Sequence, residues 1–114
     1  MGEKPDKLQL NKCFLIGEVL GKPTMMNLGK KYRYAAFFWI DVSRIWEIDG
    51  ASHLYSFKIR VRALDNVGKW CFRKLDKGMM VRVEGALYEE RAHEFKPFLG
   101  LNAMKVRAMN QYNA

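Results

Sequence analysis

The chain has 114 residues, of which 49% are apolar, enough for one domain with a hydrophobic core but not for two. Its 20 lysine and arginine residues outnumber the 12 aspartate and glutamate residues, and the net charge of +8 is typical of small domains that bind nucleic acid or an anionic membrane surface. No apolar run approaches the ~20 residues of a membrane-spanning helix, and residues 1–11 are too polar for a signal peptide.

A single domain is predicted from residue 11 to residue 109, between a flexible N-terminal arm at residues 1–10 and a frayed C-terminus at residues 110–114. The two cysteines, Cys13 and Cys71, lie in apolar stretches and give no disulfide framework. We expect buried free thiols, which fit a reducing cytoplasm.

The first two predicted strands are rich in apolar residues. The first spans residues 13–20, where Gly17 indicates a bend or a bulge. The second spans residues 32–42 and is apolar on both faces. We therefore expect the core to cover one of its faces and a partner subunit or a ligand to cover the other.

The third predicted strand follows an exposed loop. Residues 46–54 contain the pair Asp49-Gly50, which is typical of a loop. The strand itself, residues 55–64, alternates cleanly between apolar and basic residues. Its odd-numbered residues from Phe57 onward are expected to face inward, and its even-numbered residues to face outward.

A helix follows the third strand, with Asp65 or Asn66 as its predicted N-cap and Gly78 as the residue that ends it. The fourth strand spans residues 79–88, followed by a polar hairpin at residues 89–94 and a fifth strand at residues 98–107. This order predicts an all-β fold, a five-stranded OB-fold Greek-key barrel with one helix between strands 3 and 4. A split β-roll or an SH3-like barrel is the alternative.

The sequence shows no signature of catalysis or of a metal site. His53 and His93 fall in different predicted loops, without a cysteine or aspartate at metal-ligand spacing. It contains no phosphate-binding loop, nucleophile elbow or paired carboxylates. We therefore expect a protein that is not an enzyme and that needs no cofactor and no metal.

Three segments resemble the bacterial single-stranded DNA-binding proteins. They are NKCFLIG at residues 11–17, AAFFWIDVS at residues 35–43 and LDKGMMVRVEGAL at residues 75–87. The resemblance covers residues 11–107 and implies a cytoplasmic, nucleoid-associated OB-fold protein that binds single-stranded DNA as a homodimer or homotetramer. The linker and acidic tip of that family do not appear before Ala114. Either a C-terminal tail has been removed, or the chain resembles a tailless relative such as the primosomal replication proteins.

A row of cations follows the third predicted strand. The outward side chains of Lys58, Arg60 and Arg62 are about 6.6 Å apart, since they are two residues apart along a strand. Phosphates along a single strand have a similar spacing, so this row can follow a nucleic-acid backbone. The alternative is an outer face that only keeps the barrel soluble. The other candidate cations are Arg33, Lys30 and Lys31, near the turn before the second strand.

Aromatic rings are the second part of the predicted site, because each exposed ring can stack on a base. Trp46 ends the segment Ser-x-x-Trp just past the second strand and is expected to stack, with loop anchoring as the alternative. Trp39 fits base stacking and a subunit interface equally well. The remaining candidates are Phe57 and Tyr88.

Together these features predict non-enzymatic, largely sequence-independent binding of single-stranded DNA in replication, recombination or repair, with a steep salt dependence. One alternative is a tailless OB-fold protein of replication restart that mainly contacts replication or repair proteins. Another is an RNA-binding OB domain. Self-association is expected through strand edges and apolar contacts of the first two strands. Membrane binding is not expected, because no basic amphipathic helix of useful length is predicted.

Overall fold

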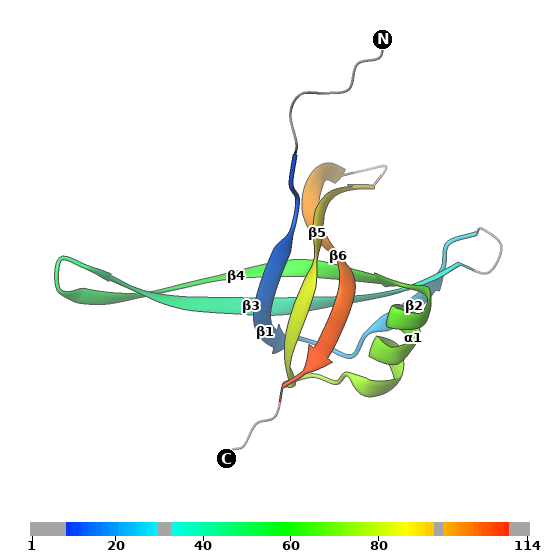
Figure 1. Cartoon of the computed structure of the whole chain (residues 1–114), viewed down its shortest axis with the longest axis horizontal. Helices are drawn as coiled ribbons and strands as arrows, with labels where there is room; N and C mark the ends of the chain where they lie inside the picture. The colour runs from blue at the N-terminus through cyan, green and yellow to red at the C-terminus, as the bar shows by residue number, and fades with distance from the viewer. Residues whose placement is uncertain (1–8, 30–32, 93–94, 110–114) are drawn as a thin grey trace, which may run out of the picture.

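The computed structural model describes residues 9–29, 33–92 and 95–109. Within these ranges the chain forms six strands and one helix, and one long hairpin projects from the body of the molecule (Figure 1). In chain order the elements are β1 (Cys13–Val19), β2 (Thr24–Asn27), β3 (Tyr34–Ile48), β4 (Ala51–Leu64), α1 (Asp65–Lys74), β5 (Met80–Ala92) and β6 (Phe95–Ala108). The predicted N-terminal arm and frayed C-terminus lie outside the described residues, apart from residues 9 and 10, so the extent of the domain stays a prediction.

Five of the described strands close a barrel. Their order is β1-β5-β6-β4-β3, and β1 completes the circle by pairing with β3 at Glu18 and Val19. The β4–β6 pair is parallel and the others are antiparallel, and α1 lies between the third and fourth barrel strands in the chain. This topology confirms the predicted all-β OB-fold Greek-key barrel. The short strand β2 pairs with β3 and was not predicted, because its four residues are too few to show an alternating pattern.

The strands β3 and β4 extend beyond the barrel as a two-stranded ribbon (Figure 1). Their register continues without interruption to the pair Ile48 and Ala51. The turn between them has φ values of 53° at Asp49 and 79° at Gly50, and two positive φ values are those of a type I′ hairpin turn. The prediction of an exposed loop at residues 46–54 was therefore wrong, because Asp49-Gly50 joins two paired strands.

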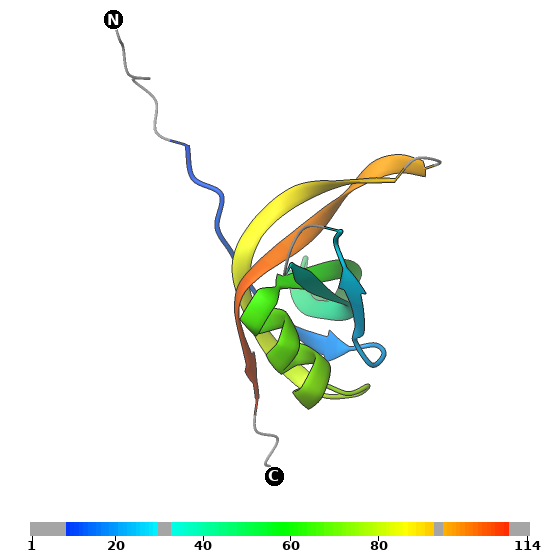
Figure 2. The same cartoon turned by 90° about the vertical axis from the view of Figure 1, so that its right-hand side faces the viewer.

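The hydrophobic core fills the barrel and continues beneath α1, which packs against one end of it (Figure 2). Its fully buried side chains come from every barrel strand and from α1. The largest of them are Ile40, Leu75, Leu101, Val19, Val61, Val81, Val83 and Cys71.

The ends of α1 differ from the prediction. Leu64 occupies the N-cap position and makes no side-chain cap hydrogen bond. The Asp65 carboxylate instead accepts a hydrogen bond from the Tyr34 backbone N–H at 3.5 Å and forms an ion pair with Arg33 at 3.5 Å. These contacts connect the start of α1 to the start of β3, and the carboxylate does not cap the helix. The helix ends at Lys74, and Gly78 lies beyond it in the turn before β5. Within the described ranges, no helix has the length and apolar character needed to cross a membrane.

The strands β5 and β6 are longer than predicted. Glu89 pairs with Leu99 and Glu90 pairs with Phe98, so residues 89–92 continue β5, and the polar hairpin predicted at residues 89–94 is correspondingly shorter. More buried and more exposed side chains still alternate through Glu89 and Glu90. Because both residues are polar, the sequence predicts a loop there instead.

The two free cysteines differ in exposure, contrary to the expectation that both are buried. Cys71 is fully buried on α1, whereas Cys13 on β1 is partly exposed. Burial raises the pKa of the Cys71 thiol to about 12. We therefore predict that a Cys13→Ser chain does not react with a thiol reagent at pH 8 until it unfolds, because the reactive thiolate is absent there. Labelling of the folded Cys13→Ser chain at the rate of a free thiol would contradict this.

Candidate nucleic-acid interface

Strands β3, β4, β5 and β6 present one outer face on which rings and charged groups lie side by side. Paired residues on neighbouring strands share a face of the sheet. Trp39 lies opposite Arg60, and the parallel β6 strand places Gly100 beside Arg60. Across β5 and β6, Tyr88 lies opposite Gly100. Of the residues that the register gathers on this side, we call nine the barrel face: Phe37, Trp39, Lys58, Arg60, Arg62, Tyr88, Glu90, Phe98 and Asn102. Asp41, the direct partner of Lys58, lies on the same side.

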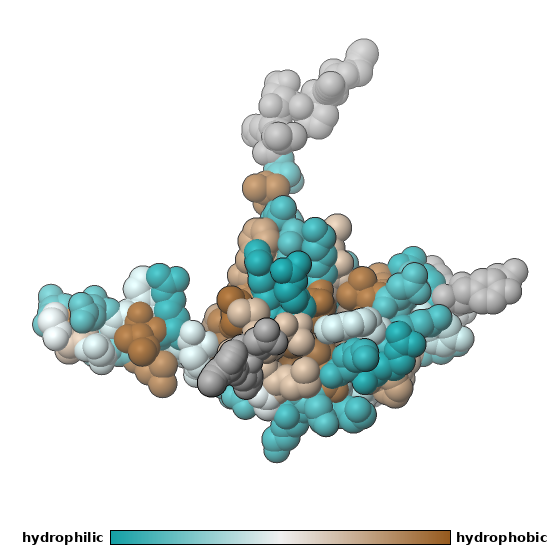
Figure 3. All heavy atoms as spheres, turned by 60° about the horizontal axis from the view of Figure 1, so that its bottom comes forward, coloured by the Kyte–Doolittle hydropathy of each residue, from teal (hydrophilic) through white to brown (hydrophobic). Residues whose placement is uncertain are grey.

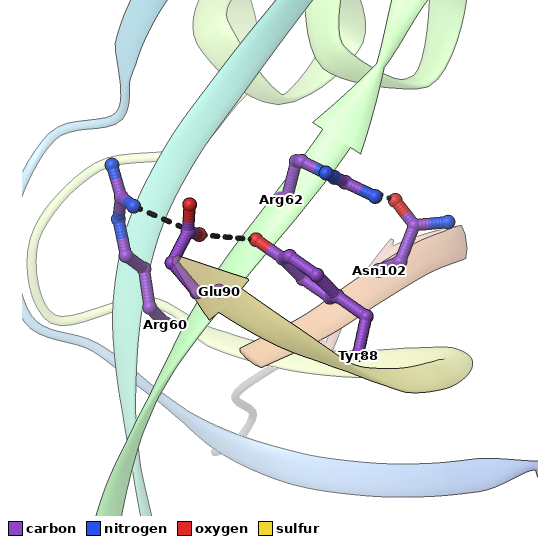
Figure 4. A network of polar contacts seen from close by, with 5 residues as sticks. All are labelled: Arg60, Arg62, Tyr88, Glu90 and Asn102. Atoms are coloured by element: carbon purple, nitrogen blue, oxygen red, sulfur yellow. Dashed lines mark hydrogen bonds and ion pairs between the residues drawn. The ribbon is translucent and has the colours of Figure 1, made fainter. Parts of the chain in front are cut away.

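A polar network crosses the centre of the barrel face (Figure 4). Glu90 Oε1 accepts hydrogen bonds from Arg60 Nη1 at 3.0 Å and from the Tyr88 hydroxyl at 2.5 Å. Arg62 Nε donates to Asn102 Oδ1 at 3.0 Å, and the Arg62 guanidinium lies 3.9 Å from the centroid of the Tyr88 ring. These contacts hold both arginines in fixed orientations.

The aromatic rings of the barrel face divide into exposed and supporting rings. Trp39 and Phe98 stack with their ring centroids 6.3 Å apart and an interplanar angle of 18°. They are 43% and 36% exposed, so their outer surfaces can receive a base. Phe37 is buried, and the Arg60 guanidinium lies 3.9 Å from its ring centroid. A hollow of about 280 Å³ adjoins Trp39 beside the turn after β1, with Lys22 in its wall.

The three cations of β4 are not equivalent. Arg60 is ion-paired with Glu90, and both side chains are largely shielded from water. Arg62 is hydrogen-bonded to the neutral amide of Asn102 and keeps its net positive charge. Lys58 is exposed and lies opposite Asp41 in the register. The row of cations therefore contains one neutralised and two charged positions.

Other predicted site residues lie away from the barrel face. Trp46 lies on the ribbon, edge-on to the Tyr55 ring at 6.4 Å, with the Arg44 guanidinium 4.4 Å from its ring centroid. Phe57 was predicted to face inward, but it is half-exposed where β4 leaves the barrel. Arg33 precedes β3 and pairs with Asp65. Lys30 and Lys31 lie outside the described residues.

The sequence reasoning did not identify five residues of this region, namely Phe37, Glu90, Phe98, Gly100 and Asn102. Glu90 and Phe98 were placed in or next to a loop, and the parallel pairing of β4 with β6 that positions Asn102 has no local sequence signal. Gly100 has a steric role, because a Cβ atom there would lie 2.9 Å from the Tyr88 ring. The glycine lets that ring lie flat against β6.

Comparison with known proteins agrees with this architecture. No protein-family model and no curated protein matches the sequence. Solved structures do match. A deletion mutant of the single-stranded DNA-binding protein from Thermus aquaticus is 23% identical with a TM-score of 0.78, over 90% of this chain and 52% of that one. The chain thus spans about half the length of the Thermus protein.

Two further structures align over most of both chains. The Plasmodium falciparum single-stranded DNA-binding protein, solved with single-stranded DNA, is 22% identical with a TM-score of 0.76, over 96% of this chain and 100% of that one. The small single-stranded DNA-binding protein from Streptomyces coelicolor is 17% identical with a TM-score of 0.71, over 86% and 91%. The chain has the fold of single-stranded DNA-binding proteins.

The Tyr88 hydroxyl gives a test of the polar network. Burial raises its pKa to about 12, assisted by the hydrogen bond to Glu90, against an ordinary value of 10. Because the folded-state pKa is raised, the stability contributed by the neutral phenol is complete below pH 10 and is lost as the pH rises through about 12. We predict that ultraviolet titration of tyrosinate shows one late-ionising tyrosine, which disappears in Tyr88→Phe. Identical titration curves for the two chains would contradict the network.

Proposed function

We propose that the barrel face binds single-stranded DNA, largely independently of sequence and without catalysis. The observation that carries this proposal is the half-exposed Trp39–Phe98 stack next to the Arg62–Tyr88 pair, on one face of an OB barrel. OB folds bind oligonucleotides on the corresponding strands. A structural neighbour, the Plasmodium protein, was solved with single-stranded DNA.

In this proposal, different residues of the barrel face contact the bases and the phosphates. A base stacks on the Trp39–Phe98 pair, since every base has a π-face and stacking tolerates all sequences. Phosphates are attracted to Arg62 and Lys58, whose positive charges are available. The carboxylate of Glu90 repels phosphate, so Arg60 contributes less. Binding of this kind needs neither a metal nor a cofactor.

We further infer a cytoplasmic, nucleoid-associated role in replication, recombination or repair, in which the protein holds exposed single strands. Such a role fits the net charge of +8, because a basic domain associates rapidly with a polyanion. Contacts with replication or repair proteins are part of the same proposal.

The stacking pair gives the first test of this function. We predict that Trp39→Ala and Phe98→Ala each weaken binding of a homopyrimidine oligonucleotide by ~1–3 kcal/mol, the contribution of one stacked base. Fluorescence anisotropy of a labelled oligonucleotide measures the change. Phe72→Ala is the matched control, because Phe72 is 39% exposed but lies on α1. Equal affinities of all four chains would overturn the proposal, and tighter binding of the matching RNA would favour an RNA-binding domain.

The cations give a second, independent test. We predict that Lys58→Ala with Arg62→Ala flattens the slope of log affinity against log salt by about 1.4, since each phosphate contact contributes roughly 0.7 on single strands. Arg60→Ala should change the slope by less, because Glu90 already neutralises it. The loss of affinity should be equal for oligonucleotides of all base compositions, because phosphates carry no sequence information. An unchanged slope would show that the row only keeps the barrel soluble.

We also propose that the protein forms a homodimer along the edge of β1. Residues 13–17 of β1 pair with β5, and β1 reaches β3 only at Glu18 and Val19, so one edge of its N-terminal part is open among the described residues. Phe14 and Ile16 are each about half-exposed beside that edge. An open strand edge with apolar neighbours favours pairing with a second copy.

We predict that Ile16→Asp shifts the protein toward the monomer in sedimentation experiments, because the charge would be desolvated at the paired edge. Phe72→Asp, which introduces the same charge at an exposed position on α1, should leave the mass of the assembly unchanged. Reductant should have no effect. A wild-type monomer at micromolar concentration would contradict this proposal.

A further inference from the structure

The outer part of the β3–β4 ribbon has a charge opposite to that of the whole protein. Residues 45–57, which we call the ribbon tip, contain Glu47 and Asp49 but no lysine or arginine, a formal charge of −2 in a chain of +8. Arg44 and Lys58 mark the point where the positive charge resumes. Glu47 and Asp49 repel phosphate at the outer end of the ribbon, whereas the Arg44 guanidinium lies 4.4 Å from the Trp46 ring centroid, nearer the barrel.

The ribbon tip is also strongly apolar. Its six large apolar side chains are between 46% and 70% exposed, and they are Ile45, Trp46, Ile48, Leu54, Tyr55 and Phe57. Figure 3 shows apolar side chains on the projecting ribbon. A two-stranded ribbon has no core of its own, and a group of exposed apolar side chains marks a protein-contact surface.

A groove of about 650 Å³ between α1 and the ends of β5 and β6 has the complementary character. Trp70 and Val67 of α1 and Met104 of β6 supply apolar surface, while Arg82, Lys105 and Arg107 supply three positive charges. The only carboxylate among the lining residues is that of Glu84, which is already ion-paired with Lys12 at 3.5 Å.

Two arginines of this groove face each other. Arg82 and Arg107 are direct partners in the β5–β6 register, and neither forms an ion pair with any described residue. Like charges directly opposite each other destabilise a sheet. An acidic side chain placed between them would relieve this repulsion.

We propose that the ribbon tip of one copy docks in the α1–β6 groove of a second copy of this chain. The apolar Ile48 would contact the apolar surface of the groove, while Glu47 and Asp49 meet its cations. The ribbon cannot reach its own groove, because the ribbon tip and α1 lie at opposite ends of a molecule whose longest extent is 54 Å (Figure 1). This contact is separate from the barrel face, and its groove borders the edge of β1, because the Arg82 guanidinium lies 5.4 Å from the centroid of the Phe14 ring.

A charge exchange tests the contact. The first chain carries Glu47→Lys and Asp49→Asn, since asparagine tolerates the positive φ at residue 49. The second carries Arg82→Glu and Arg107→Glu, which keeps a like-charged pair in register and reverses its sign. We expect each variant alone to self-associate about tenfold or more weakly than the wild type, as for close charge pairs at an interface. We expect the equimolar mixture to recover wild-type association, because each ribbon tip then meets a groove of opposite charge.

Control variants distinguish this contact from a general effect of net charge and from nucleic-acid binding by the ribbon. Lys74→Glu with Lys77→Glu makes the same change in charge as the Arg82 and Arg107 variant, but outside the groove, and should leave self-association unchanged. A mixture that associates no better than its components would overturn the proposal. So would normal self-association of the Glu47 and Asp49 variant together with altered affinity for single-stranded DNA, which would place nucleic acid at Trp46. The oligonucleotide affinities of the Trp39 and Phe98 variants test the proposed function of the barrel face and do not test the contact between the ribbon tip and the groove.

Discussion

The pairing of β3 with β4 is the contact on which the other features of this structure depend. One uninterrupted register directs Phe38, Ile40 and Val61 into the core and places Trp39, Arg60 and Arg62 on the opposite side. The same register continues past the barrel and carries the ribbon into solvent. Closure of the barrel adds a steric constraint, because a Cβ atom on Gly17 would lie 2.7 Å from the Asp41 carbonyl oxygen where β1 meets β3. The glycine permits this approach.

Much of the fold could be predicted because alternation is a local property. In residues 58–63 the polarity of each side chain indicates the face on which it lies, and the element order then limits the topology to few barrels. The errors arose where one local pattern has two meanings. Asp49-Gly50 is common in loops and in type I′ turns, and only the pairing of its flanking residues distinguishes them. Asp65 is a favourable N-cap residue, but a distant arginine and backbone N–H group occupy its carboxylate.

The candidate site was less predictable, because it is assembled across strands. Residue type and alternation predicted Trp39, Arg62 and Tyr88 as site residues, but not the neighbours that set their orientation and charge. Glu90 lies next to Arg60 only because β5 pairs with β6 and β6 pairs with β4. A row of arginines in a sequence therefore does not give the charge of the surface that it forms.

The distribution of charge also bears on the proposed preference for single strands. The net charge of +8 is not concentrated on the barrel face, where Glu90 neutralises one of the three cations of β4. Arg82, Lys105 and Arg107 lie instead around the α1–β6 groove, and the ribbon tip is acidic. Because phosphate attraction at the barrel face is modest, the proposed function assigns a large share of the affinity for nucleic acid to stacking on Trp39 and Phe98. A duplex buries its base faces, so a surface that relies on stacking favours single strands over duplex even though both carry phosphates.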